Sequence, residues 1–166
     1  EIKFSLSKPE VLPKVPEIKD EDNFSVSFSV NDEFITRFVK SKDALSDLEI
    51  FTVETREGFT GEELVFTIGT TITNSIEFSV EADIKESFSS IPFDSNLFKE
   101  ILKSNKNYHS GEIRINKKGV LNLRSRSIEF HRGFAAVYTI IVYSPYMVSG
   151  VDQISLSIVK VRLNSG

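Results

Sequence analysis

The sequence predicts an α+β fold of two strand–helix–three-strand units placed side by side, with continuous sheets and both helices on one face. Two observations lead to this prediction. Two short amphipathic helices, expected at about 32–43 and 94–106, interrupt a chain whose other segments mostly alternate apolar and polar residues, as strands do. The two helical segments also share a residue pattern at a constant offset of 63 positions. We therefore expect an internal duplication.

The two helical segments correspond position by position. Each begins at a residue that can cap a helix N-terminus, Asn31 in the first and Asp94 in the second. Each then carries two apolar pairs one turn apart, which are Phe34, Ile35, Phe38 and Val39 in the first and Leu97, Phe98, Ile101 and Leu102 in the second. A single apolar face on each helix predicts that both pack against a sheet.

The first unit is expected at about 23–82. Residues 24–30 alternate apolar side chains with serine, which is the pattern of a half-buried strand. After the helix, further strands are predicted at 50–55, 63–68 and 75–80, and the glycines between the first two indicate a hairpin.

The second unit, at about 83–145, repeats this order. Its predicted strands are 86–91 before the helix and 111–116, 120–123 and 135–142 after it. Ile50 and Ile113 are again 63 positions apart, so we expect the duplication to continue into the first strand after each helix.

The two ends of the chain do not fit the repeated plan. Residues 1–19 combine a strand-like start with Pro9, Pro13 and Pro16, which predicts a strand remnant followed by an extended connector. Residues 146–166 form an extra tail with a strand pattern at 154–163. The duplicated plan offers no position for this strand.

Composition and motifs argue against several classes of protein. The 166 residues carry a net charge of −4 and no cysteine, so thiolate metal sites and disulfides are excluded. The two histidines stand in no metal-ligand spacing, and no serine or threonine has a plausible activating base. The apolar runs are too short to span a bilayer. We expect no enzyme, no metal, no cofactor and no membrane partner.

Four segments together point to a known architecture: 24–34 with its helix, 90–98 with its helix, the 111–123 hairpin and the closing strand at 136–140. Their order resembles one domain of a DNA polymerase sliding clamp, and most of all the carboxyl-terminal domain of the clamps of tailed bacteriophages. The resemblance covers roughly residues 2–143. It implies that 2–16 are the last strand of a preceding clamp domain and its connector.

The resemblance also implies a function in DNA replication. Such a protein is a ring-forming processivity factor that encircles duplex DNA without sequence specificity and tethers a DNA polymerase. Its implied partners are duplex DNA, the polymerase, a clamp loader and further copies of itself, in the cytoplasm of a phage-infected or bacterial cell. The other hypothesis from the sequence is a non-enzymatic β-rich structural or binding module of a virion or cell surface, with no DNA role.

The helices supply candidate DNA-contacting residues. Lys99, Lys103 and Lys106 form a stripe opposite the apolar face of the second helix. On the first helix the corresponding candidates are Arg37, Lys40 and Lys42. Cations placed in this way would neutralise phosphates without reading bases, which gives weak and salt-sensitive contact. Exposed helix lysines are also commonly just solvated, and Glu33 and Glu100 dilute the basic signal.

Overall fold

The computed structural model describes residues 23–70, 72, 74–104, 110–129, 134–144 and 159–165. This part of the chain contains two helices and two antiparallel sheets, so the predicted α+β class is confirmed. The predictions for residues 1–19, for Lys106 and for 154–158 lie outside the described residues.

The elements follow one another in two runs of similar order. The first run is β1 (Val26–Val30), α1 (Asp32–Ala44), β2 (Ile50–Glu57), β3 (Glu62–Gly69) and β4 (Ser75–Val80). The second run is β5 (Asp83–Ile84), β6 (Ile91–Asp94), α2 (Ser95–Ser104), β7 (Ser110–Asn116), β8 (Val120–Glu129) and β9 (Phe134–Tyr143), and it is followed by β10 (Val159–Ser165).

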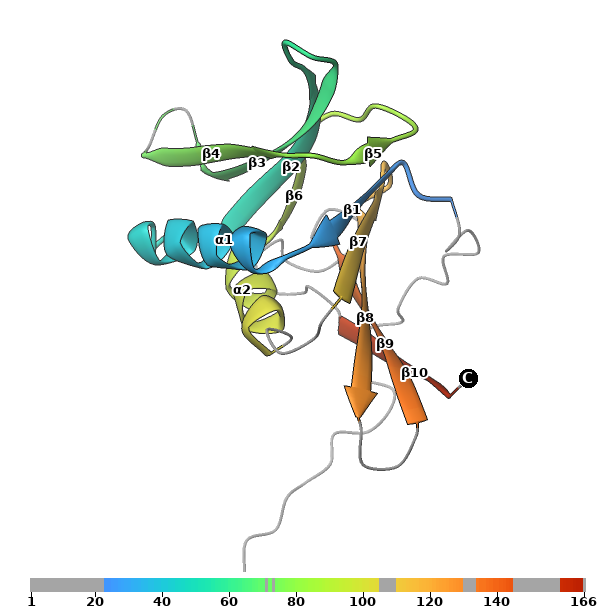
Figure 1. The fold of residues 1–166 in the computed structure, drawn as a ribbon. Helices are drawn as coiled ribbons and strands as arrows, with labels where there is room; N and C mark the ends of the chain where they lie inside the picture. Colours follow the sequence, from blue (N-terminus) through green and yellow to red (C-terminus); the bar gives the residue numbers. More distant parts are fainter. Residues whose placement is uncertain are drawn as a thin grey trace, which may run out of the picture.

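The two runs exchange their first long strands. The larger sheet, sheet A, has the order β10-β9-β8-β7-β1-β5, and sheet B has the order β4-β3-β2-β6. β1 thus joins the strands that follow α2, and β6 joins the strands that follow α1 (Figure 1). Each sheet contains the same four-strand arrangement. The expectation of continuous sheets is wrong for the described strands, because hydrogen bonding divides them into two separate sheets.

Strand register corrects the predicted equivalence of Ile50 and Ile113. Phe28 of β1 is paired with Ile113, and Ile91 of β6, which lies 63 positions after Phe28, is paired with Val53. The structural counterpart of Ile113 is therefore Val53. Both of these side chains are fully buried, while Ile50 is 44% exposed. The chain covers 22 positions from the cap Asn31 to Val53 but 19 positions from the cap Asp94 to Ile113, which accounts for the shift of three residues.

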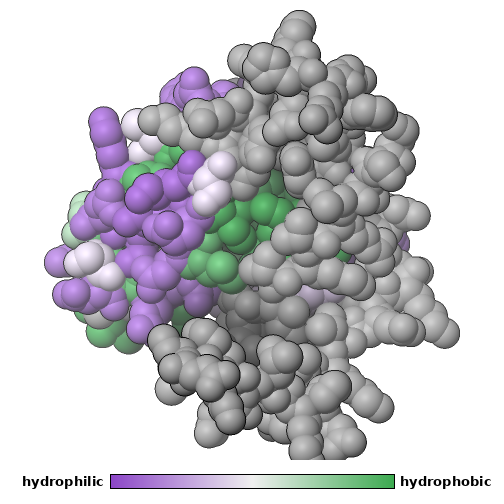
Figure 2. Space-filling view, turned by 90° about the horizontal axis from the view of Figure 1, so that it is seen from below, coloured by the Kyte–Doolittle hydropathy of each residue, from purple (hydrophilic) through white to green (hydrophobic). Residues whose placement is uncertain are grey.

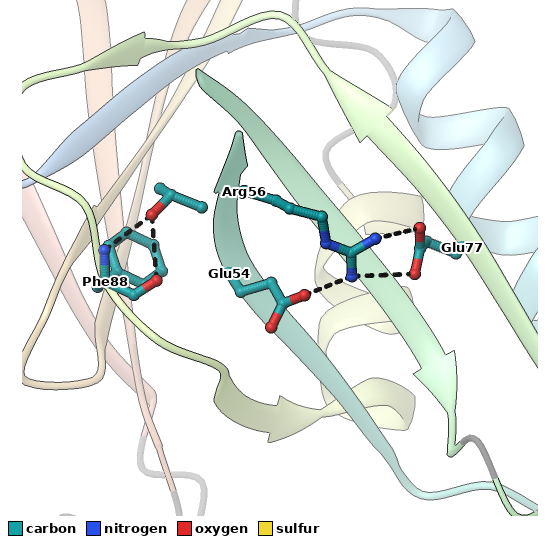
Figure 3. A network of polar contacts seen from close by, with 5 residues as sticks. Glu54, Arg56, Glu77 and Phe88 are labelled. Carbon is teal, nitrogen blue, oxygen red and sulfur yellow. Dashed lines mark hydrogen bonds and ion pairs between the residues drawn. The ribbon is translucent and has the colours of Figure 1, made fainter. Parts of the chain in front are cut away.

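The predicted strand at 86–91 is also corrected, since β6 begins only at Ile91. Upstream of it, the backbone groups of Phe88 form hydrogen bonds with Thr55, and the Phe88 side chain lies in the core. The Thr55 N–H donates to the Phe88 carbonyl (3.2 Å), and the Phe88 N–H donates to the Thr55 hydroxyl oxygen (2.8 Å; Figure 3). A side chain therefore replaces a backbone partner at this point. Pro92 is tolerated within β6 because this strand lies at the edge of sheet B.

The carboxyl-terminal tail contributes a strand, β10, for which the predicted duplication had no position. β10 pairs with β9 along its whole length, from Val159 opposite Val142 to Ser165 opposite Ala136. It therefore extends sheet A by one strand.

One hydrophobic core joins both helices to both sheets. The rings of Phe38 on α1 and Phe98 on α2 meet edge to face with centroids 4.8 Å apart. Phe28 of sheet A lies against Phe34 of α1 (5.1 Å) and Phe66 of sheet B (5.7 Å), and so connects the three layers. The two helices consequently lie beside one another on the same side of the sheets (Figure 1).

Candidate nucleic-acid interface

Equivalent hydrogen bonds begin the two helices. The side-chain oxygen of Asn31 accepts from the N–H of Phe34 at 2.8 Å, and that of Asp94 accepts from the N–H of Leu97 at 2.8 Å. Both bonds are the N-terminal caps that the sequence predicted. The buried Ser95 also connects the two units, because its hydroxyl donates a hydrogen bond to the carbonyl of Leu48 at 2.8 Å.

The exposed sides of the helices are linked by an ion pair. Nζ of Lys99 on α2 lies 2.5 Å from Oδ1 of Asp43 on α1. The hydrogen bond from Lys99 is the main reason why the pKa of the Asp43 carboxyl is lowered from its ordinary value, although partial desolvation opposes the shift. Lys99 is thus already paired, and 23% of its side chain is exposed.

Lys42 does not lie on the exposed face. Its side chain is only 2% exposed, and Nζ donates to the carbonyl of Ser46 at 2.7 Å and to that of Leu45 at 3.5 Å. These carbonyls belong to the C-cap residue and the residue after it, where a cation interacts favourably with the negative end of the helix dipole. Lys42 follows Phe38 by one turn and Ile35 by two, so helical periodicity alone places it on the apolar side.

The remaining candidate DNA-contacting residues differ in whether another group of the protein already holds their side chains. The guanidinium of Arg37 lies 5.1 Å from the centre of the Phe78 ring, which holds it toward β4. Lys40 is exposed and has no ion-pair partner within the described residues. The side chain of Lys103 is 53% exposed, and its Nζ is 3.9 Å from Oε1 of Glu100. Lys106 lies outside the described residues.

Charge on the helix pair is balanced rather than basic. The helices lie on the left of the molecule in Figure 1. Seen from below, the coloured atoms on that side belong mostly to hydrophilic residues (Figure 2). The exposed or half-exposed cations of the helices are matched by an equal number of exposed carboxylates, which are Asp32, Glu33, Asp43 and Glu100. Sequence reasoning missed the role of Asp43, because its partner lies on a helix 56 positions away.

A further cation, Arg56, is committed to the exposed face of sheet B. Its guanidinium donates to Glu77 on β4 at 2.7 Å and to Glu54 on β2 at 2.5 Å (Figure 3). These two carboxylates raise the pKa of Arg56. Exposed networks of this kind contribute little to stability, and the guanidinium of Arg56 is already paired with two carboxylates.

Comparison with known proteins gives no family: no protein-family model matches the chain, and no match is found among curated proteins. Within the described residues, no group of three or more His, Cys, Asp or Glu side chains could hold a metal ion. Neither helix that the structure describes has the length and apolar character needed to cross a membrane.

Proposed function

We propose that this chain forms a sliding-clamp-type domain, which tethers a DNA polymerase by surrounding duplex DNA. The observation that carries the proposal is the arrangement of two equivalently capped helices side by side in front of two sheets that exchange their first strands. A ring built from such domains has sheets outside and helices toward the DNA. The function is mechanical and involves no chemistry on the DNA.

In this proposal the helices contact phosphates. Arg37, Lys40 and Lys103 are the exposed cations available for the contact. Lys99 takes part only when it leaves Asp43. Each phosphate that is neutralised contributes about 0.9 to the slope of log affinity against log salt, so three contacts predict a weak and strongly salt-dependent interaction. Indifference to sequence is what sliding requires.

Ring assembly in this proposal uses the sheet edges. Within the described chain, sheet A ends in β10 and β5 and sheet B ends in β4 and β6, and outward-facing strand edges can pair with a neighbouring copy. The polymerase and a clamp loader would dock outside the ring.

One observation favours a second candidate function. The balanced charge of the helix pair is typical of an ordinary solvated surface, which suits a non-enzymatic structural or binding module without a DNA role.

Charge reversal on the helices separates the two candidates. The variant Lys40→Glu/Lys103→Glu is compared with the wild type for binding to a fluorescent duplex across a salt series. Lys85→Glu is the control, because Lys85 is exposed but follows β5 rather than lying on a helix. The clamp proposal predicts salt-dependent binding that the helix variant loses and the control keeps. No binding by the wild type at low salt, or equal binding by both variants, favours the module.

A further inference from the structure

A cleft of about 730 Å³ opens between the two sheets, away from the contact between the helices. Three residues of β1 (Ser27, Phe28 and Ser29) form one wall, and the end of β4 with the segment leading to β5 forms the other. The first turns of α1 close one side through Glu33, Phe34 and Arg37. In Figure 1 this is the region where the chain passes from β4 to β5 above α1 and β1.

The wall formed by β1 has an open strand edge. β5 pairs only with Val26 and Ser27, so the rest of β1, 28–30, has no strand neighbour on that side among the described strands. The other side of β1 is paired with β7 over all five residues. An unpaired edge of this kind is a template for an added strand.

The cleft is strongly acidic. Four carboxylates line it, namely Glu33, Glu81, Asp83 and Glu112. Only Glu112 is neutralised, by Arg114 at 2.8 Å, and the other three have no ion-pair partner within the described part of the chain. The one lining cation, Arg37, is held against the Phe78 ring. The lining therefore carries three carboxylates without an ion-pair partner against the single positive charge of Arg37, beside phenylalanine rings.

We propose that this cleft binds an extended peptide segment of a partner protein that carries lysine or arginine at alternate positions. The backbone of the segment adds to the open edge of β1, and its cations face Glu33, Glu81 and Asp83. Backbone pairing supplies affinity in strand addition, and alternate side chains supply specificity. The proposal does not depend on DNA binding, because the proposed peptide contacts are the edge of β1 and three carboxylates, although Arg37 borders the cleft as well.

A library of random eight-residue peptides displayed on phage is the probe. Peptides are selected on the wild-type chain at a concentration where light scattering shows a single oligomeric state. They are then measured on Glu81→Lys/Asp83→Lys, in which two exposed cleft carboxylates are reversed. Asp47→Lys/Glu49→Lys carries the same charge change on exposed residues of the loop after α1 and is the matched control. Thermal unfolding verifies that both variants fold.

The expected result is enrichment of peptides with alternating basic residues that bind the cleft variant at least tenfold more weakly and the control unchanged. Hydrogen exchange of the wild type should slow on peptide binding at residues 28–30. Failure to enrich basic peptides, equal binding to both variants, or unchanged exchange in β1 would overturn the proposal.

Discussion

Nζ of Lys99 on α2 lies 2.5 Å from Oδ1 of Asp43 on α1, so a carboxylate of one unit neutralises an ammonium group of the other. The side chain of Asp43 in this pair is exposed, and exposed ion pairs contribute little to stability. The ion pair therefore matters more for the charge of the helix surface than for the stability of the fold. It removes one of the cations that the sequence assigned to DNA contact.

The first prediction concerns the titration of Asp43. Its pKa is lower in the folded chain than in the unfolded one, so the ion pair stabilises the fold above the unfolded pKa and loses this effect as pH falls through the folded pKa. In the variant Lys99→Met, the titration midpoint of the Asp43 carboxyl should rise toward the ordinary value for aspartate. Carbon-detected NMR of the Asp43 carboxyl measures it, and an unchanged midpoint would show that Lys99 is not the cause.

The second prediction joins this ion pair to the proposed DNA contact. Asp43→Asn removes a carboxylate from the helix face and releases Lys99. Duplex affinity should increase, and the slope of log affinity against log salt should steepen by about 1, because one more phosphate is neutralised. A salt titration by fluorescence anisotropy measures both quantities. Identical slopes for the variant and the wild type would place Lys99 outside the contact.

The third prediction separates Lys42 from Lys40. Lys42→Ala should lower the free energy of unfolding by about 1–3 kcal/mol, because two carbonyls at the end of α1 lose a charged donor. Lys40→Ala should change it by less than about 0.5 kcal/mol, because Lys40 is exposed and unpaired in the described chain. Urea denaturation gives both values. The reverse order would contradict the burial of Lys42.

The fourth prediction uses the two N-terminal caps. Asn31→Ala and Asp94→Ala should each cost about 1 kcal/mol, since each removes a cap that holds one N–H group. Asn31→Asp and Asp94→Asn keep the acceptor and serve as controls that should stay close to the wild type. Equilibrium unfolding of the four variants tests the equivalence of the helices. A loss at one cap only would show that the two starts are energetically different.

Helix positions and caps were predictable because they depend on local spacing. Asn31 and Asp94 cap the helices as expected, and the apolar pairs of both helices lie in or against the core. Register was not predictable from the offset between the helices, because the first unit has three more residues between its cap and the paired strand residue, so Val53 rather than Ile50 is equivalent to Ile113. The exchange of β1 and β6 between the sheets is a property of tertiary pairing, which no local pattern carries.

The candidate site was only partly predictable, for a similar physical reason. A helical stripe shows which side chains share a face, but not what faces them from another element. Lys99 meets Asp43 across the helix pair, and Arg37 meets Phe78 on β4. Lys42 is different, because its spacing from Phe38 already indicated a buried position.

The most direct test of the clamp proposal is whether binding depends on the topology of the DNA. The chain is incubated with a linear duplex that is fixed to a bead at one end and free at the other, and the free end is then blocked with a bulky protein. After a high-salt wash, which removes phosphate contacts, an encircling ring should stay on the blocked duplex and be released when a restriction enzyme cuts it. Equal loss in the wash from blocked and open duplexes would contradict encirclement.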